Sequence, residues 1–163
     1  MVYMLPESGK ISMLDVWREL NPPTDPKDCD YYFETREDFD ARRDQIIAEN
    51  NDDLSQKTFG FGDGVTDLSD AFASTLITST PKMIVAKNVT DFYGCFSGCS
   101  NITSTLPDVW NKNKFPKITD GRNYAYDCTK ASNYNEIPSN FGGPSTNPAV
   151  PLSIKQIEKS INK

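Results

Sequence analysis

The chain has 163 residues, with 17 basic and 23 acidic side chains and a net charge of −6. This length supports one modest hydrophobic core, so we expect a single domain with appendages. Because no block of lysine and arginine occurs, duplex nucleic acid is excluded as an expected partner: phosphate binding requires clustered positive charge.

No apolar run approaches the ~20 residues that a bilayer-spanning helix needs. The first ten residues, MVYMLPESGK, lack the charged start and apolar core of a signal peptide. We therefore expect no membrane association and no export signal. A chain of this kind would reach the exterior as part of a particle released by lysis.

Residues 1–10 are expected to form an arm, and a short helix follows. Ser12 and Asp15 have capping-box spacing, and Leu14, Trp17 and Leu20 follow at three-residue steps. The dipeptide Pro22-Pro23 ends the helix. Since a helix this short is not stable alone, Trp17 and Leu20 are candidate interaction residues that require a partner surface.

The phrase Gly9-Lys-Ile-Ser-Met-Leu-Asp-Val-Trp-Arg-Glu-Leu20 resembles a segment of tailed-bacteriophage virion proteins. In those proteins a glycine, an Ile-Ser pair and an apolar helix ending in Arg-Glu-Leu or Arg-Glu-Phe recur near attachment segments. Trp17 and the prolines that follow depart from that pattern. The alternative is an ordinary capped amphipathic helix in a small domain.

Residues 24–34 are acidic and turn-rich around an aromatic run, and a second helix is predicted from Arg36 to Glu49. Thr35 and Asp38 form a further capping-box pair, and Phe39, Ile46 and Ile47 give the apolar face. The charged side chains of this helix, Arg42 and Arg43 included, are most simply solvated. We predict that the helix caps the open end of the repeats that follow.

The glycine-rich run 59–64 links this helix to those repeats. It lacks the lysine of a phosphate-binding loop and a flanking strand, so it favours a tight backbone passage over a nucleotide site.

One phrase then appears three times: residues 64–72 read GVTDLSDAF, residues 88–96 read NVTDFYGCF and residues 117–125 read KITDGRNYA. Repetition at spacings of 24 and 29 residues is typical of stacked repeats. The Thr-Asp pair in each copy favours a short helix beginning there, because both side chains accept backbone N–H groups. The runs 76–85 and 102–110 favour strands.

Residues 88–103 resemble the consensus NVTxMxxMFxGCxxL of bacterial-surface-antigen (BspA-like) leucine-rich repeats, and the likeness covers about residues 64–141. The first copy lacks the Gly-Cys pair of the consensus. The third copy has Ala125 at the position that Phe96 occupies in the second. The resemblance implies a short right-handed solenoid. With the helices and arm predicted from the residues, we expect an α+β fold: a short leucine-rich-repeat-like solenoid of about three units with flanking capping helices and an extended N-terminal arm. It implies binding, with no catalytic residues to carry over.

The insertion 109–116 is the one locally basic, aromatic-bearing loop. Trp110 and Phe115 are interaction candidates if exposed, and the alternative, that both rings tuck under the loop, is favoured. After a linker at residues 141–151, Ser153 and Gln156 favour a final helix. Its isoleucine stripe either closes the far end of the solenoid or pairs with another subunit.

The chain has no histidine, which removes the commonest general base and metal ligand. Its four cysteines are a weak zinc set, so no cofactor or metal is expected. Cys99 and Cys128 occupy one repeat position and would be linked in oxidising surroundings, whereas buried free thiols are expected in a cytosol.

We expect four regions: an arm and docking helix at 1–23, an acidic turn region and capping helix at 24–63, the repeats at 64–141, and a linker and helix at 142–163. The favoured function is a non-enzymatic bacteriophage virion structural protein of the tail, baseplate or neck. It would assemble in the host cytoplasm, in many copies, with other virion proteins and with a host-surface receptor as a further candidate. The alternative is a cellular leucine-rich-repeat adhesion or protein-interaction module.

Overall fold

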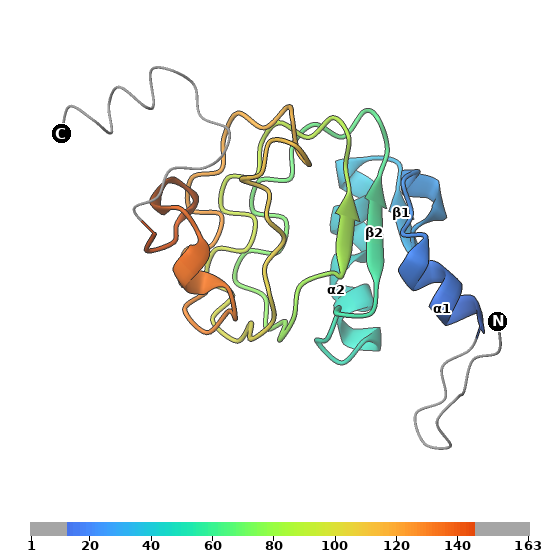
Figure 1. Ribbon diagram of the computed structural model, residues 1–163, viewed down its shortest axis with the longest axis horizontal. Coiled ribbons are helices and arrows are strands. Elements are labelled where there is room, and N and C mark those ends of the chain that lie inside the picture. Colours follow the sequence, from blue (N-terminus) through green and yellow to red (C-terminus); the bar gives the residue numbers. More distant parts are fainter. Residues whose placement is uncertain (1–12, 146–163) are drawn as a thin grey trace.

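The computed structural model of the protein describes residues 13–145 (Figure 1). Within them lie two α-helices, α1 (Met13–Leu20) and α2 (Arg36–Glu49), and a sheet of three strands, β1 (Tyr31–Phe33), β2 (Thr58–Phe61) and β3 (Met83–Val85). Short 3-10 helices occur at η1 (Pro26–Asp28), η2 (Tyr134–Glu136) and η3 (Ser139–Phe141). The expected arm at 1–10 and the expected final helix lie outside the described residues.

Both helices predicted before residue 50 are confirmed. The α1 helix ends where the Asn21 backbone N–H donates to the Trp17 carbonyl at 2.8 Å, before two prolines that have no N–H to continue the ladder. The α2 helix begins where the Thr35 hydroxyl accepts from the backbone N–H of Asp38 at 3.1 Å. Local capping chemistry thus sets these boundaries.

The three strands pair in parallel in the order β1-β2-β3, with Tyr31 opposite Phe59 and Phe59 opposite Ile84. Strand β2 includes part of the glycine-rich run, which the sequence favours as a link. The backbone of η1 approaches β2 so closely that a Cβ on Gly60 would overlap the Pro26 carbonyl. Glycine at position 60 therefore permits the close backbone passage that the sequence predicts, although this residue lies inside a strand.

The predicted fold class, a leucine-rich-repeat-like solenoid of about three units, is wrong. The named elements form an open three-stranded parallel sheet, behind which α2 lies in Figure 1, and the chain from 64 onward consists mainly of turns. None of the three phrase copies is helical. Of the two runs expected as strands, only the end of the first is one, as β3, and residues 102–110 contain no named strand.

Turns replace helices because the backbone hydrogen bonds of the phrases run sideways. The Leu68 N–H donates to the Asp91 carbonyl at 2.9 Å, and the Phe92 N–H donates to the Asp120 carbonyl at 2.8 Å. Isolated parallel bridges join Asp67 to Asp91 and Asp91 to Asp120. An α-helix would direct these same N–H groups along its own axis, so the two arrangements are mutually exclusive.

Left-handed backbone at one shared position also stops a helix in each copy. Asp70, Gly94 and Asn123 have φ of 55°, 60° and 58°. A right-handed helix cannot pass through such a residue, and only the second copy uses glycine, for which this conformation is free of strain.

The aspartates of the phrase do accept backbone N–H groups, but in turns. Asp67, Asp91 and Asp120 each accept from the N–H two residues later, at 2.7, 2.8 and 3.0 Å. This is the hydrogen bond of an Asx-turn, in which a carboxylate stands in for a backbone carbonyl. Thr-Asp therefore begins a turn in all three copies.

One core runs through the described residues from α2 to the third phrase. Phe39 contacts Phe72 edge to face at 5.3 Å, Phe72 stacks on Phe96 at 5.1 Å, and Phe96 meets Tyr124 at 5.4 Å. All four side chains are fully buried. Aromatic pairs of this kind contribute about 0.5–1.5 kcal/mol each beyond their area burial.

Arginines of α2 satisfy the carbonyls at the outer edge of the first phrase, a role the sequence did not indicate. Arg36 donates to the Ser69 carbonyl at 2.8 Å and to the Asp67 carbonyl at 3.4 Å, and Arg43 donates to the Ala71 carbonyl at 3.1 Å. The matching carbonyls of the second phrase accept hydrogen bonds from N–H groups of the first phrase. The first phrase has no preceding copy, so the arginines of α2 supply the donors instead. Solvation is therefore the wrong description of these side chains.

Candidate interaction surface

The α1 helix presents an exposed apolar stripe. Met13, Trp17 and Leu20 are 57 %, 59 % and 70 % exposed, and they share one face because they lie four and then three residues apart. The sequence selected Trp17 and Leu20 and missed Met13, although the four-residue step from Met13 to Trp17 carries the same signal. We call these three residues the α1 stripe.

The two other candidate residues, Trp110 and Phe115, pack against the core. Phe115 meets the Phe92 ring at 5.5 Å, and Trp110 lies 6.4 Å from Tyr124 and 6.2 Å from Phe141. Both are half-buried. The structure thus separates the four candidates into an exposed pair on α1 and a packed pair on the insertion.

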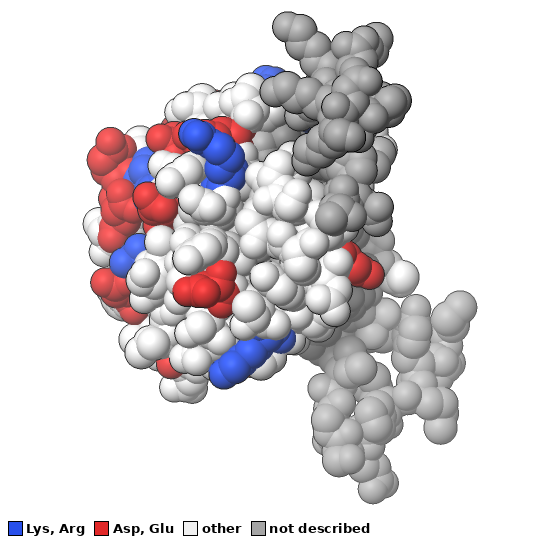
Figure 2. Space-filling view, turned by 90° about the vertical axis from the view of Figure 1, so that its left-hand side faces the viewer, with Lys and Arg blue, Asp and Glu red and all other residues white. Residues whose placement is uncertain are grey.

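The end of the body at the third phrase is partly closed by η3. The Ala125 N–H donates to the Phe141 carbonyl at 2.9 Å, and Gly121 lies under the Phe141 ring, where a Cβ would collide with it. Tyr126 remains 56 % exposed beside them. Figure 2 shows this end: uncharged side chains cover most of it, acidic side chains are densest along the left margin, and one acidic group lies near the centre.

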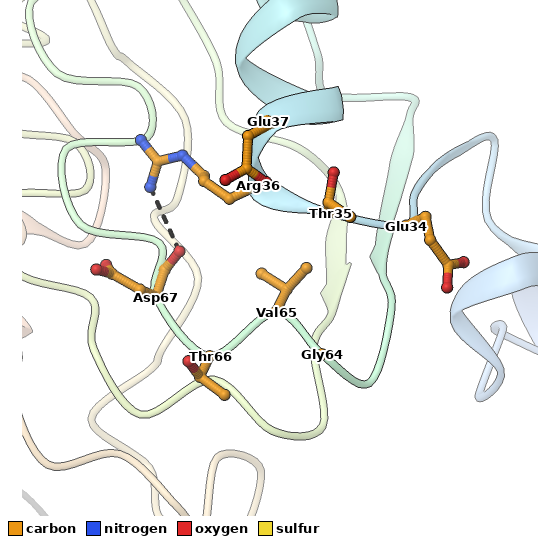
Figure 3. A pocket seen from close by; sticks show the side chains of 8 residues that line it. All are labelled: Glu34, Thr35, Arg36, Glu37, Gly64, Val65, Thr66 and Asp67. Atoms are coloured by element: carbon orange, nitrogen blue, oxygen red, sulfur yellow. Dashed lines mark hydrogen bonds between the residues drawn. The ribbon is translucent and has the colours of Figure 1, made fainter.

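A hollow of about 240 Å³ lies between the start of α2 and the first phrase (Figure 3). Its chemistry does not suit a ligand. Arg36 points across it toward the Asp67 carbonyl and is already bonded there, while the Glu34 side chain points away. The Ser69 hydrogen bond holds the pKa of Asp67 below its usual value, so this carboxylate is charged and opposes anions. The volume is below the 300–1,000 Å³ typical of small-molecule sites.

Cys95, Cys99 and Cys128 are buried free thiols, so the disulfide between Cys99 and Cys128 is not formed. The Cys99 thiol donates to the Phe72 carbonyl at 2.9 Å and the Cys128 thiol to the Phe96 carbonyl at 3.1 Å. Burial raises the pKa of Cys128 to about 12 and also raises those of Cys95 and Cys99. Neutral, buried thiols of this kind are unreactive core side chains.

Over residues 13–145, no group of three or more potential ligands gathers as a metal site would require. The same residues contain no helix with the length and apolarity to cross a membrane. Comparison with known proteins gives no match to a family model, a curated protein or a solved structure. The resemblances of residues 9–20 and 64–141 therefore stay expectations, and the geometry of α1 is the strongest indication of a site.

Proposed function

We propose that the protein is a non-enzymatic bacteriophage virion structural protein, a component of the tail, baseplate or neck, that joins the particle through α1. The observation that carries this proposal is the α1 stripe. It lies in the segment that resembles attachment regions of virion proteins, and it leaves three large apolar side chains in water.

Burying the stripe supplies the free energy for attachment. Moving a side chain of this size from water into an apolar contact contributes about 1.5–3 kcal/mol. Tryptophan is among the residues that most often dominate interfaces. The stripe is therefore suited to packing against another virion protein, with a host-surface receptor as a further candidate partner.

The site of action is the virion, assembled in the host cytoplasm with many copies of the protein per particle. Mass spectrometry of purified particles tests this directly. We expect peptides of this chain at a stoichiometry comparable to other tail or neck components. If the chain is absent from particles and recovered from the cell surface instead, a cellular interaction module replaces the virion assignment.

A further inference from the structure

The two ends of the chain each carry an apolar stripe. The α1 helix lies at one end of the body, on the side of β1, and the described chain ends at residue 145 at the opposite end (Figure 1). Eighteen residues follow Ser145 in the sequence. They contain a second apolar stripe, Ile154, Ile157 and Ile161, whose spacing suits a short helix.

We propose that this C-terminal segment of one copy docks on the α1 stripe of a neighbouring copy, so that copies join end to end. The inference rests on the proposed function in taking α1 as the attachment surface, and it goes further by naming the occupant. The interface is heterologous: one patch of each copy contacts a different patch of the next.

Charge favours this occupant. Residues 146–163 carry three lysines and one glutamate, a side-chain charge of +2, in a chain whose net charge is −6. Residues 13–30, which contain α1, carry five acidic and two basic side chains, a charge of −3. The most basic terminus of the chain therefore complements the region around α1, while a second α1 placed there would be repelled.

Length also fits. Each stripe spans eight residues from first to last, and seven helical steps of about 1.5 Å make about 10 Å, so the two would match along their contact. The segment between them and the body contains Pro144, Pro148 and Pro151. Prolines at this density are typical of an extended spacer, whose reach suits contact with a neighbouring copy.

An interface of this size is small, so assembly in dilute solution should be weak and concentration-dependent. It should also weaken with salt, because the Debye length falls from about 10 Å at 0.1 M to about 3 Å at 1 M. Sedimentation velocity of the full-length chain over a concentration series should therefore give an open series of oligomers.

Two full-length variants test the heterologous geometry. The stripe variant carries Trp17→Ser and Leu20→Ser, and the tail variant carries Ile154→Ser and Ile157→Ser. Each alone should be monomeric, with self-association weakened by at least about tenfold, as expected for loss of central interface side chains. Mixed one to one, they should form a dimer and nothing larger, because the mixture retains one working pair of patches. Tyr126→Ser, on an exposed ring away from α1, is the matched control and should assemble like the wild type.

Four outcomes would overturn the inference. A wild-type chain that stays monomeric at every concentration excludes it. A variant that dimerises on its own shows that its intact patch pairs with its own kind, and a mixture of the two variants that gives no dimer shows that the two patches do not pair. Tail substitution that exposes Trp17, seen as a red shift in its fluorescence without any change in mass, shows that the segment folds onto its own copy. Recovery of the chain in particles together with any of these results would leave the proposed function intact.

Discussion

The arginines of α2 give the sharpest test of how the body is held together. We consider Arg36→Met and Arg43→Met, which keep much of the aliphatic length but remove the donors to the carbonyls of Asp67, Ser69 and Ala71. A hydrogen bond from a charged donor contributes roughly 1.5–3 kcal/mol. Because the two side chains are 27 % and 26 % exposed, water partly replaces the lost donor, so we expect about 1–2 kcal/mol for each substitution.

Urea unfolding of each variant measures this loss, and the m-value should stay constant because the surface exposed on unfolding is unchanged. Asp40→Asn and Asp44→Asn remove only the exposed ion pairs of these arginines and should change stability by less than about 0.5 kcal/mol. Lys130→Met, at an exposed lysine, controls for net charge. If both arginine variants match this control within about 0.5 kcal/mol, the idea that they complete the edge of the first phrase is refuted.

Three further predictions concern other parts of the fold. Gly94→Ala should destabilise the protein by at least about 1 kcal/mol in urea unfolding, because φ there is 60° and the new Cβ would collide with the Asp70 carboxylate. Gly64 lies in open space, so Gly64→Ala should leave stability unchanged. Burial raises the pKa of Cys128 from 9.0 to about 12, so the contribution of this thiol to stability is present below pH 9 and falls as pH rises toward 12. Cys128→Ala should flatten the decline of unfolding free energy with alkaline pH, and an unchanged slope would contradict this prediction. Trp17→Ser should leave the thermal midpoint of the wild type unchanged at low protein concentration, since the ring is 59 % exposed; a fall of several degrees would show that Trp17 belongs to the core.

Sequence reasoning succeeded where local chemistry decides the structure. The start of α2 follows from the Thr35 side chain, and the end of α1 follows from Asn21 and two prolines. These signals act within a few residues, so no tertiary information is needed to interpret them.

Prediction from the sequence failed where hydrogen bonds join segments that are distant in the chain. The phrase copies carry good helix-start residues, but N–H groups of the first two copies pair with the next copy and the Ala125 N–H of the third pairs with Phe141. Asp70 and Asn123 also take left-handed backbone that non-glycine residues rarely adopt. Gly94 in the second copy was the one available sign of such a turn. The predicted fold class is wrong because turns, whose hydrogen bonds join distant segments, take the place of the expected helices.

The four interaction candidates stay predictions, and the structure shows only how exposed each side chain is. The spacing of Trp17 and Leu20 indicates an amphipathic helix that needs a partner, and the structure leaves both exposed. The packing of Trp110 and Phe115 depends on Phe92, Tyr124 and Phe141, which come together only in the folded chain. The same dependence on tertiary contacts hid the roles of Arg36 and Arg43.

Oxidative footprinting of the α1 stripe most directly tests the claim that α1 attaches this protein to a particle. Trp17 and Leu20 should be readily modified in the free protein, where they are 59 % and 70 % exposed, and strongly protected in purified particles. Tyr126 provides an exposed internal reference at the other end of the body. Equal modification of Trp17 in free protein and in particles would contradict the account.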